Sequence, residues 1–211
     1  MGNSSFQQRL KAHQVSWAEA NGLADKTEAN SKRPWVLKHE HQAFNLFDPN
    51  WWTYIGGKEH RWARALNSSQ CFAVNLFAPL IENPALAKAV YTCLLPDRPL
   101  EPDDEIVVEL EYSPEQARQW LGERRQQTQV DAAFAILRDG KVVGHLLVEV
   151  KLGETTFGTC RGAKAAVKNS RGNPNPEHCQ NLAGVLAKPE EFCWLTSTEG
   201  RRYWTYITSP N

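Results

Sequence analysis

Residues 130–151, VDAAFAILRDGKVVGHLLVEVK, consist of two apolar runs separated by Arg138-Asp139-Gly140-Lys141. An Asp-Gly pair between two such runs is a strong short-range signal for a β-hairpin. We therefore expect two antiparallel strands, over residues 130–137 and 143–151, to lie side by side. This hairpin organises the rest of the predicted fold.

Side-chain alternation along the strands indicates which face of the hairpin is buried. One face of each strand carries only apolar residues, and both sets belong against the core: Val130, Ala132, Phe134 and Ile136 on the first strand, and Leu146, Val148 and Val150 on the second. The opposite faces then carry Asp131 on one strand and Glu149 and Lys151 on the other. Asp131 should lie opposite or diagonal to Glu149.

The length of the connecting loop tests this arrangement. A strict two-residue loop at Asp139-Gly140 would put Asp131 and Glu149 on opposite faces of the hairpin. A loop with an odd number of residues, such as a three-residue loop with a glycine bulge, would put them on the same face. We predict the odd-length loop, and a plain two-residue turn would argue against a shared site.

Two carboxylates and a lysine on adjoining strands match the needs of a divalent metal ion and a phosphodiester. The carboxylates of Asp131 and Glu149, with the Val150 carbonyl, would hold Mg²⁺ or Mn²⁺ as hard oxygen ligands. Such an ion polarises a phosphoryl oxygen and helps to form hydroxide from water. Lys151, two residues after Glu149 on the same face, would orient that water or offset developing charge. Phosphodiester hydrolysis is the expected chemistry.

Other functions remain open at this point. Glu149 and Lys151 could be solvated residues on an exposed strand face, and the D…ExK pattern alone matches many sequences by chance. The main alternative is a non-catalytic nucleic-acid- or protein-binding module that keeps the fold. A third is a metal-dependent hydrolase of small phosphoesters. The charged pair ends an apolar strand beside a lone Asp131, which favours the metal-dependent site.

Helical patterns occupy much of the chain before the hairpin. Residues 5–21 read as a polar amphipathic helix that Ser5 could cap, and residues 59–80 read as a second helix with a polar insert at 67–70. Asn83-Pro84 has the form of a cap followed by a proline at the first helical position, and begins a helix to about Leu94.

Strand patterns complete an α/β fold. Residues 106–112 alternate as a strand, a short helix follows over 113–122, and two final strands are expected at 192–195 and 202–207. We predict a mixed central β-sheet flanked by helices. A single domain should span residues 1–211, with a polar N-terminal helical extension over about residues 1–34.

Composition limits the cellular context and the partners. The chain has no apolar run near the ~20 residues that span a bilayer, and no signal-peptide pattern, so we expect a cytoplasmic protein with reduced thiols. Because the formal net charge is zero, a nucleic-acid-binding face must come from local clustering. Arg161, Lys164 and Lys168 could form one along a helix, although a solvated helix face is the more frequent meaning of such a run.

Cysteine and histidine residues carry less information. Cys160, Cys179 and Cys193 lie in the last third of the chain with His178, but without the short C-x₂-C units of zinc or cluster sites. We expect buried thiols here and no iron–sulfur cluster. His60 is expected to be a solvated or core histidine.

Several segments resemble a known superfamily. Gln129-Val130-Asp131-Ala132 and Val148-Glu149-Val150-Lys151 resemble the core of the PD-(D/E)XK nucleases, in which acidic residues and a lysine on adjacent central strands form the metal site. Residues 67–77, NSSQCFAVNLF, resemble the SSQ…NLF helix of a bacterial branch of that superfamily. The N-terminal helix and residues 120–123 also fit this branch, so the resemblance covers most of the chain.

The resemblance implies a restriction endonuclease-like core that cleaves DNA with Mg²⁺ or Mn²⁺. It also implies that Glu123 and Gln129 extend the site and that Gln70 faces it from the helix. Each has a structural alternative: Glu123 could form a surface ion pair, Gln129 could only flank the strand, and Gln70 could satisfy buried backbone groups. The chain departs from the superfamily name at Val130, where a proline would precede the aspartate. DNA is the expected partner, and a homodimer is left open.

Overall fold

The structure is a computed structural model of the chain and describes residues 5–28, 32–123, 127–152, 160–163 and 173–204. Contacts divide the chain into two compact units. The first unit comprises Met1–Tyr112 and Val130–Thr155, and the second comprises Ser113–Gln129 and Thr156–Asn211. A single domain with an N-terminal extension stays a prediction.

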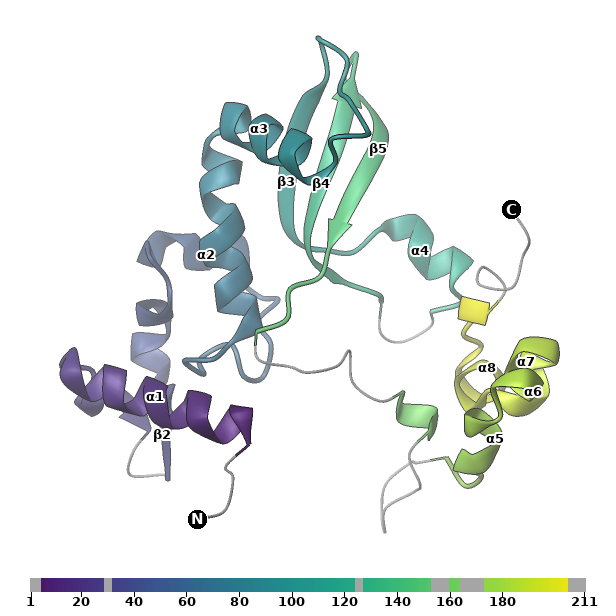
Figure 1. Cartoon of the computed structure of the whole chain (residues 1–211), viewed down its shortest axis with the longest axis horizontal. Helices are drawn as coiled ribbons and strands as arrows, with labels where there is room; N and C mark the ends of the chain where they lie inside the picture. The colour runs from purple at the N-terminus through teal and green to yellow at the C-terminus, as the bar shows by residue number, and fades with distance from the viewer. Residues whose placement is uncertain (1–4, 29–31, 124–126, 153–159, 164–172, 205–211) are drawn as a thin grey trace. The chain divides into compact units, whose positions relative to one another are not determined.

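A three-stranded antiparallel sheet, in the order β3-β4-β5, forms the centre of the first unit (Figure 1). Its strands are β3 (Glu105–Tyr112), β4 (Val130–Arg138) and β5 (Lys141–Val148). Two short strands, β1 (Thr27–Glu28) and β2 (Arg33–Leu37), pair separately. The predicted α/β class is confirmed, and every strand pair among the described residues is antiparallel.

The apolar face predicted for the hairpin forms the core of this unit. Ala132 and Phe134 of β4 are fully buried, and Val150 just beyond β5 is buried with them. The ring of Phe134 meets the ring of Phe77 edge-on, with centroids 5.8 Å apart and an interplanar angle of 89°. Such aromatic pairs add to the free energy of burying apolar area. The other face of the sheet exposes Leu147.

Two helices cover the apolar face of the sheet (Figure 1): α2 (Ser69–Glu82) and α3 (Pro84–Leu94). As predicted, Asn83 caps α3, and its side-chain oxygen accepts a hydrogen bond from the Leu86 amide at 3.1 Å. The helix predicted over 59–80 begins only at Ser69, so that part of the prediction is wrong. The Ser68 hydroxyl accepts a hydrogen bond from the Cys71 amide at 3.2 Å and caps α2 there.

The N-terminal part of the first unit contains the remaining helices. The predicted helix α1 (Phe6–Ala20) is confirmed, with a capping box between Ser5 and Gln8. Within the described residues, it is followed by the 3₁₀ helices η1 (Ala24–Lys26), η3 (His39–Asn45) and η4 (Pro49–Tyr54).

The connection between β4 and β5 differs from the predicted one. Asp139 and Gly140, with φ of 51° and 69°, form a two-residue turn, so the predicted odd-length loop is wrong. The extra residue lies instead within β5. Leu137 pairs with Val142 but Ile136 pairs with Gly144, which leaves Val143 as a β-bulge.

The bulge shifts the pairing of β4 and β5 by one residue, as a loop with one more residue would. On the side of the bulge away from the turn, Ala132 pairs with Val148. Continuing this register by one residue puts Asp131 opposite Glu149, and directly opposed residues project from the same face of a sheet.

The second unit is helical where it is described. It contains α4 (Glu115–Trp120), η5 (Arg161–Ala163), α5 (Pro176–Gln180), α6 (Leu182–Ala187), α7 (Pro189–Phe192) and α8 (Trp194–Glu199). The strand predicted at 192–195 is wrong. Phe192 ends α7 and Trp194 begins α8, because Pro189 suits a first helical turn and Gly200, with φ of 70°, ends α8.

The other predicted C-terminal strand cannot be judged in full. Tyr203 and Trp204 are helical, and residues 205–207 lie outside the described part of the chain. Across the described ranges, no helix has the length and apolar character needed to cross a membrane.

Phe134→Ala should destabilise the first unit by about 3–5 kcal/mol, because it leaves a cavity beside Phe77 in addition to the lost transfer free energy. Leu147→Ala on the exposed face of the neighbouring strand is the matched control and should change stability by less than about 0.5 kcal/mol. Urea unfolding followed by far-UV circular dichroism measures both. Equal effects would contradict the assignment of the two faces.

Candidate active site

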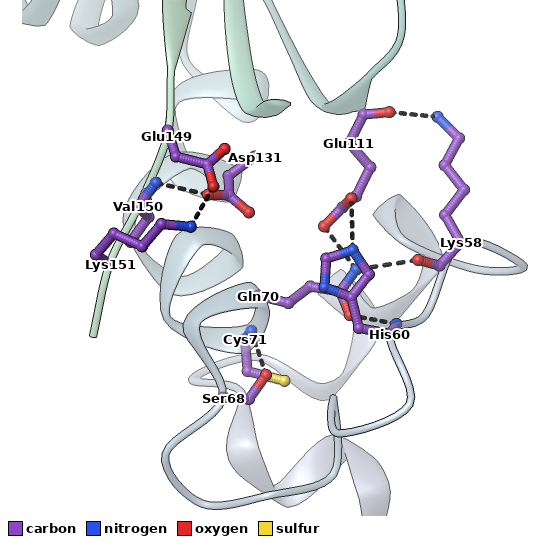
Figure 2. Close-up of polar contacts among 10 residues, drawn as sticks. All are labelled: Lys58, His60, Ser68, Gln70, Cys71, Glu111, Asp131, Glu149, Val150 and Lys151. Carbon is purple, nitrogen blue, oxygen red and sulfur yellow. Dashed lines mark hydrogen bonds and ion pairs between the residues drawn. The ribbon is translucent and has the colours of Figure 1, made fainter. Parts of the chain in front are cut away.

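Three carboxylates from successive strands lie in one row across the sheet. On β3 and β4, Glu111 and Asp131 lie between the paired residues Leu110–Ala132 and Tyr112–Val130. On β4 and β5, continuing the register one residue beyond the Ala132–Val148 pair reaches Glu149. Figure 2 shows Asp131 between Glu111 on one side and the pair formed by Glu149 and Lys151 on the other.

Asp131 is the central member of the row. Its side chain is only 8% exposed, and its Oδ2 accepts a hydrogen bond from the backbone amide of Val150 at 2.5 Å. Burial raises the pKa of Asp131; the Val150 hydrogen bond opposes this rise, and the nearby charge of Glu149 adds to it. The orientation of the Asp131 carboxylate is therefore set by the neighbouring strand, at a site that disfavours its negative charge.

Glu149 and Lys151 follow directly after the last residue of β5. The Lys151 ammonium forms an ion pair with Glu149 Oε1, and both side chains remain partly exposed. The structure thus brings the predicted Asp131, Glu149 and Lys151 together at one end of the hairpin. An exposed ammonium beside a buried carboxylate is accessible to an anionic ligand.

Glu111 belongs to this row but was missed by the sequence reasoning. It is 2% exposed and has a φ of 51°, which is uncommon for a residue with a Cβ. Burial raises the pKa of Glu111, and the charge of Asp131 raises it further. The strand pattern placed Glu111 on the solvent-facing side of β3. The positive φ that breaks this alternation had no sequence signal.

Gln70 connects α2 to Glu111. Its Nε2 donates to Glu111 Oε1 at 2.5 Å and to the Lys58 carbonyl at 3.0 Å, while its Oε1 accepts from the His60 amide at 2.9 Å. The imidazole of His60 lies 3.5 Å from Glu111 Oε2. Gln70 therefore faces the carboxylate row and also satisfies buried backbone groups. Its catalytic role stays a prediction.

The donor chemistry of the row fits a hard divalent cation. In the described part of the chain, no group of three or more His, Cys, Asp or Glu side chains is arranged to hold a metal ion. Mg²⁺ needs less, because it is usually bound through one or two carboxylates and keeps several waters. Asp131 and Glu149 supply two such carboxylates on adjoining strands.

The cysteines are free thiols in varied surroundings. Cys71 is buried beside Ser68, and burial raises the pKa of its thiol to about 11, so it is protonated near neutral pH. Cys193 is buried as expected. Cys160 is exposed and Cys179 is half-buried, so the expectation of buried thiols is wrong for these two.

Glu123 belongs to the second unit and has its own set of partners. Its carboxylate is fully buried and forms an ion pair with Arg201 at 2.5 Å. The Tyr203 hydroxyl donates to it at 2.9 Å, and both the amide and the hydroxyl of Thr128 donate to it as well. These contacts describe a structural carboxylate that joins two segments of the second unit. A role of Glu123 in catalysis stays a prediction.

The remaining predicted residues carry little structural information. Gln129 is half-buried at the end of a segment of the second unit. Arg161 begins η5, and Lys164 and Lys168 lie outside the described residues.

Glu111→Gln should remove part of the pH dependence of stability. Because burial raises the folded-state pKa of Glu111 above its ordinary value of 4.5, the folded protein binds this proton more tightly than the unfolded chain does. The free energy of unfolding therefore falls as the pH rises from that value through the raised pKa. Urea unfolding between about pH 4 and pH 8 should show a shallower fall for Glu111→Gln than for the wild type.

The control for this measurement is Glu109→Gln, at an exposed position of the same strand. It should keep the wild-type profile. A wild-type profile for Glu111→Gln as well would show that Glu111 is not a buried ionisable group.

Arg201→Ala should destabilise the second unit by about 3 kcal/mol or more, because it leaves the buried Glu123 carboxylate without its cation. Lys188→Ala, which breaks an exposed ion pair with Glu191, should cost less than about 1 kcal/mol. Hydrogen exchange of residues 113–123 and 194–204 measures the local stability. Similar effects of the two substitutions would argue against a structural role of the Glu123 network.

Comparison with known proteins assigns the chain to a family. Residues 11–208 match the model of a family described as restriction endonuclease associating with ARP. No curated protein and no solved structure matches the chain. Because the match covers nearly the whole sequence, the protein belongs to this restriction endonuclease family.

Proposed function

We propose that the protein is a metal-dependent nuclease of the PD-(D/E)XK type that hydrolyses phosphodiester bonds of DNA. Membership in a restriction endonuclease family supports a nuclease acting on DNA. The observation that carries the proposal is the juxtaposition of Asp131, Glu149 and Lys151 at the ends of two adjoining strands. A buried carboxylate, an accessible carboxylate and an ammonium are the groups that this chemistry requires.

Asp131 and Glu149, with the Val150 carbonyl, would hold Mg²⁺ or Mn²⁺. When bound, such an ion would polarise a phosphoryl oxygen and lower the pKa of a water molecule. The Val150 amide keeps the Asp131 carboxylate in one orientation through its hydrogen bond. Preorganisation of this kind removes the need to reorient the ligand during the reaction.

Lys151 supplies a positive charge that can change partners. Its ammonium now pairs with Glu149 at a partly exposed position. A phosphate oxygen that arrives beside it offers a second anionic partner, so Lys151 would orient the phosphodiester or stabilise the charge that develops on it. Glu111 lies beside Asp131, and burial raises the pKa of Glu111.

DNA binding would require further cations. We propose that Arg161, Lys164 and Lys168 contact the DNA backbone, since they are clustered in sequence without an intervening acidic residue.

Asp131→Asn and Lys151→Ala should each reduce Mg²⁺-dependent cleavage of DNA by about 100-fold or more, because each removes a charge that acts directly on the metal or the phosphate. Nicking of supercoiled plasmid, quantified on agarose gels, measures this. Asp139→Asn and Lys141→Ala remove a carboxylate and an ammonium from the turn end of the same hairpin and should cleave like the wild type.

Undiminished cleavage by Asp131→Asn would refute the assignment. An intact protein that binds DNA but cleaves none with Mg²⁺ or Mn²⁺ would support the non-catalytic binding module instead.

A further inference from the structure

A cavity of about 530 Å³ lies in the first unit beside the N-terminus of α2. Its walls include Lys11 of α1, Trp35 of β2, the segment His60 to Trp62 and Gln70 of α2. This volume is within the range of small-molecule sites, about 300–1,000 Å³. The proposed metal site does not use Lys11, Trp35, Arg61 or Trp62.

The cavity adjoins the row of carboxylates through two shared residues. His60 and Gln70 line it, and both contact the Glu111 carboxylate, at 3.5 Å and 2.5 Å respectively. Glu111 in turn is near Asp131, whose charge raises the pKa of Glu111. Figure 2 shows His60 and Gln70 on one side of Glu111 and Asp131 on the other. Glu111 therefore connects the residues that line the cavity with the proposed site of cleavage.

Two indole rings line the cavity, and a cationic side chain lies over each of them. Lys11 Nζ lies 4.7 Å from the centroid of the Trp35 ring, and Arg61 Cζ lies 5.2 Å from that of Trp62. Trp62 is 48% exposed, so much of its surface is available to a ligand. Among the described residues that line the cavity, two carry a permanent positive charge and none is a carboxylate.

These groups match the parts of a nucleotide. Aromatic rings stack on nucleobases whatever their identity, and cations beside them bind the phosphate. A guanidinium can also donate two parallel hydrogen bonds to phosphate oxygens. A ligand with anionic groups but no ring would contact only the cations, and a purely apolar ligand would contact only the indole rings.

We propose that this cavity binds one unstacked nucleotide of a DNA strand, next to the phosphodiester that is cleaved. The base contacts the ring of Trp62 or Trp35, and its phosphate contacts Arg61 or Lys11. In an intact duplex both faces of each base are covered by stacking, so the base must leave the stack, which costs least in single-stranded or frayed DNA. This inference rests on the proposed nuclease function and assigns its substrate as DNA with unpaired nucleotides.

Binding can be tested separately from cleavage. The full-length Asp131→Asn protein, in buffer with EDTA, is titrated into an end-labelled oligothymidylate of about 12 nucleotides and into a blunt duplex of the same length. Fluorescence anisotropy gives both dissociation constants. The single strand should bind more tightly than the duplex.

Substitutions in the same background locate the binding. Trp62→Ala should weaken single-strand binding by about tenfold, and Trp62→Phe should restore most of it. Arg61→Ala should reduce the slope of log K against log salt concentration by about 0.7, the value for one phosphate contact in single strands. The controls are Phe47→Ala and Arg98→Ala, which remove an exposed ring and an exposed cation that do not line the cavity and should leave binding unchanged.

Two results would overturn the inference: unchanged single-strand binding by both Trp62→Ala and Arg61→Ala, or tighter binding of the duplex than of the strand. Plasmid cleavage by the wild type decides the nuclease function independently. If the wild type cleaves plasmid and the cavity variants bind the single strand unchanged, only the proposed nucleotide-binding role of the cavity is refuted. Loss of strand binding in those variants, without any cleavage by the wild type, would support the cavity and refute the nuclease.

Discussion

Burial of one face of the β4–β5 hairpin is the constraint on which the candidate site depends. Phe134 can pack against Phe77 only if that face of the sheet is turned toward α2. The alternation of side chains then turns Asp131 away from the apolar core. A bulge at Val143 supplies the one-residue shift that keeps Asp131 and Glu149 on the same side of the sheet.

The row of carboxylates brings like charges together in a partly desolvated place, which is unfavourable without compensation. The compensation comes from several directions. Val150 donates to Asp131 through its amide, Lys151 pairs with Glu149, and Gln70 donates to Glu111. These groups hold the negative charges in place without removing them, and a divalent cation would relieve the remaining repulsion. Repulsion among the carboxylates is therefore located where a bound cation would reduce it.

Glu123 shows the same residue type in a different environment. Its carboxylate is as deeply buried as Glu111, but Arg201 neutralises it directly and Thr128 and Tyr203 occupy its oxygens. A buried carboxylate with a dedicated cation and several donors is a structural link within its unit. Asp131 accepts from the Val150 amide and has Glu149 as a carboxylate neighbour. Glu123 and Asp131 therefore differ in their partners, whereas both are buried.

The sequence by itself determined the hairpin and its buried face, because turn chemistry and side-chain alternation are local properties. The shared side of Asp131 and Glu149 depends on the bulge at Val143, which the sequence did not predict. The tertiary structure decided the rest. Glu111 reaches the row because β3 pairs with β4 and because its own φ is positive, and neither property is written in a local pattern. The cavity joins Lys11, Trp35 and Trp62 from segments far apart in the chain. Long-range packing brought these residues together, so no sequence window could contain them.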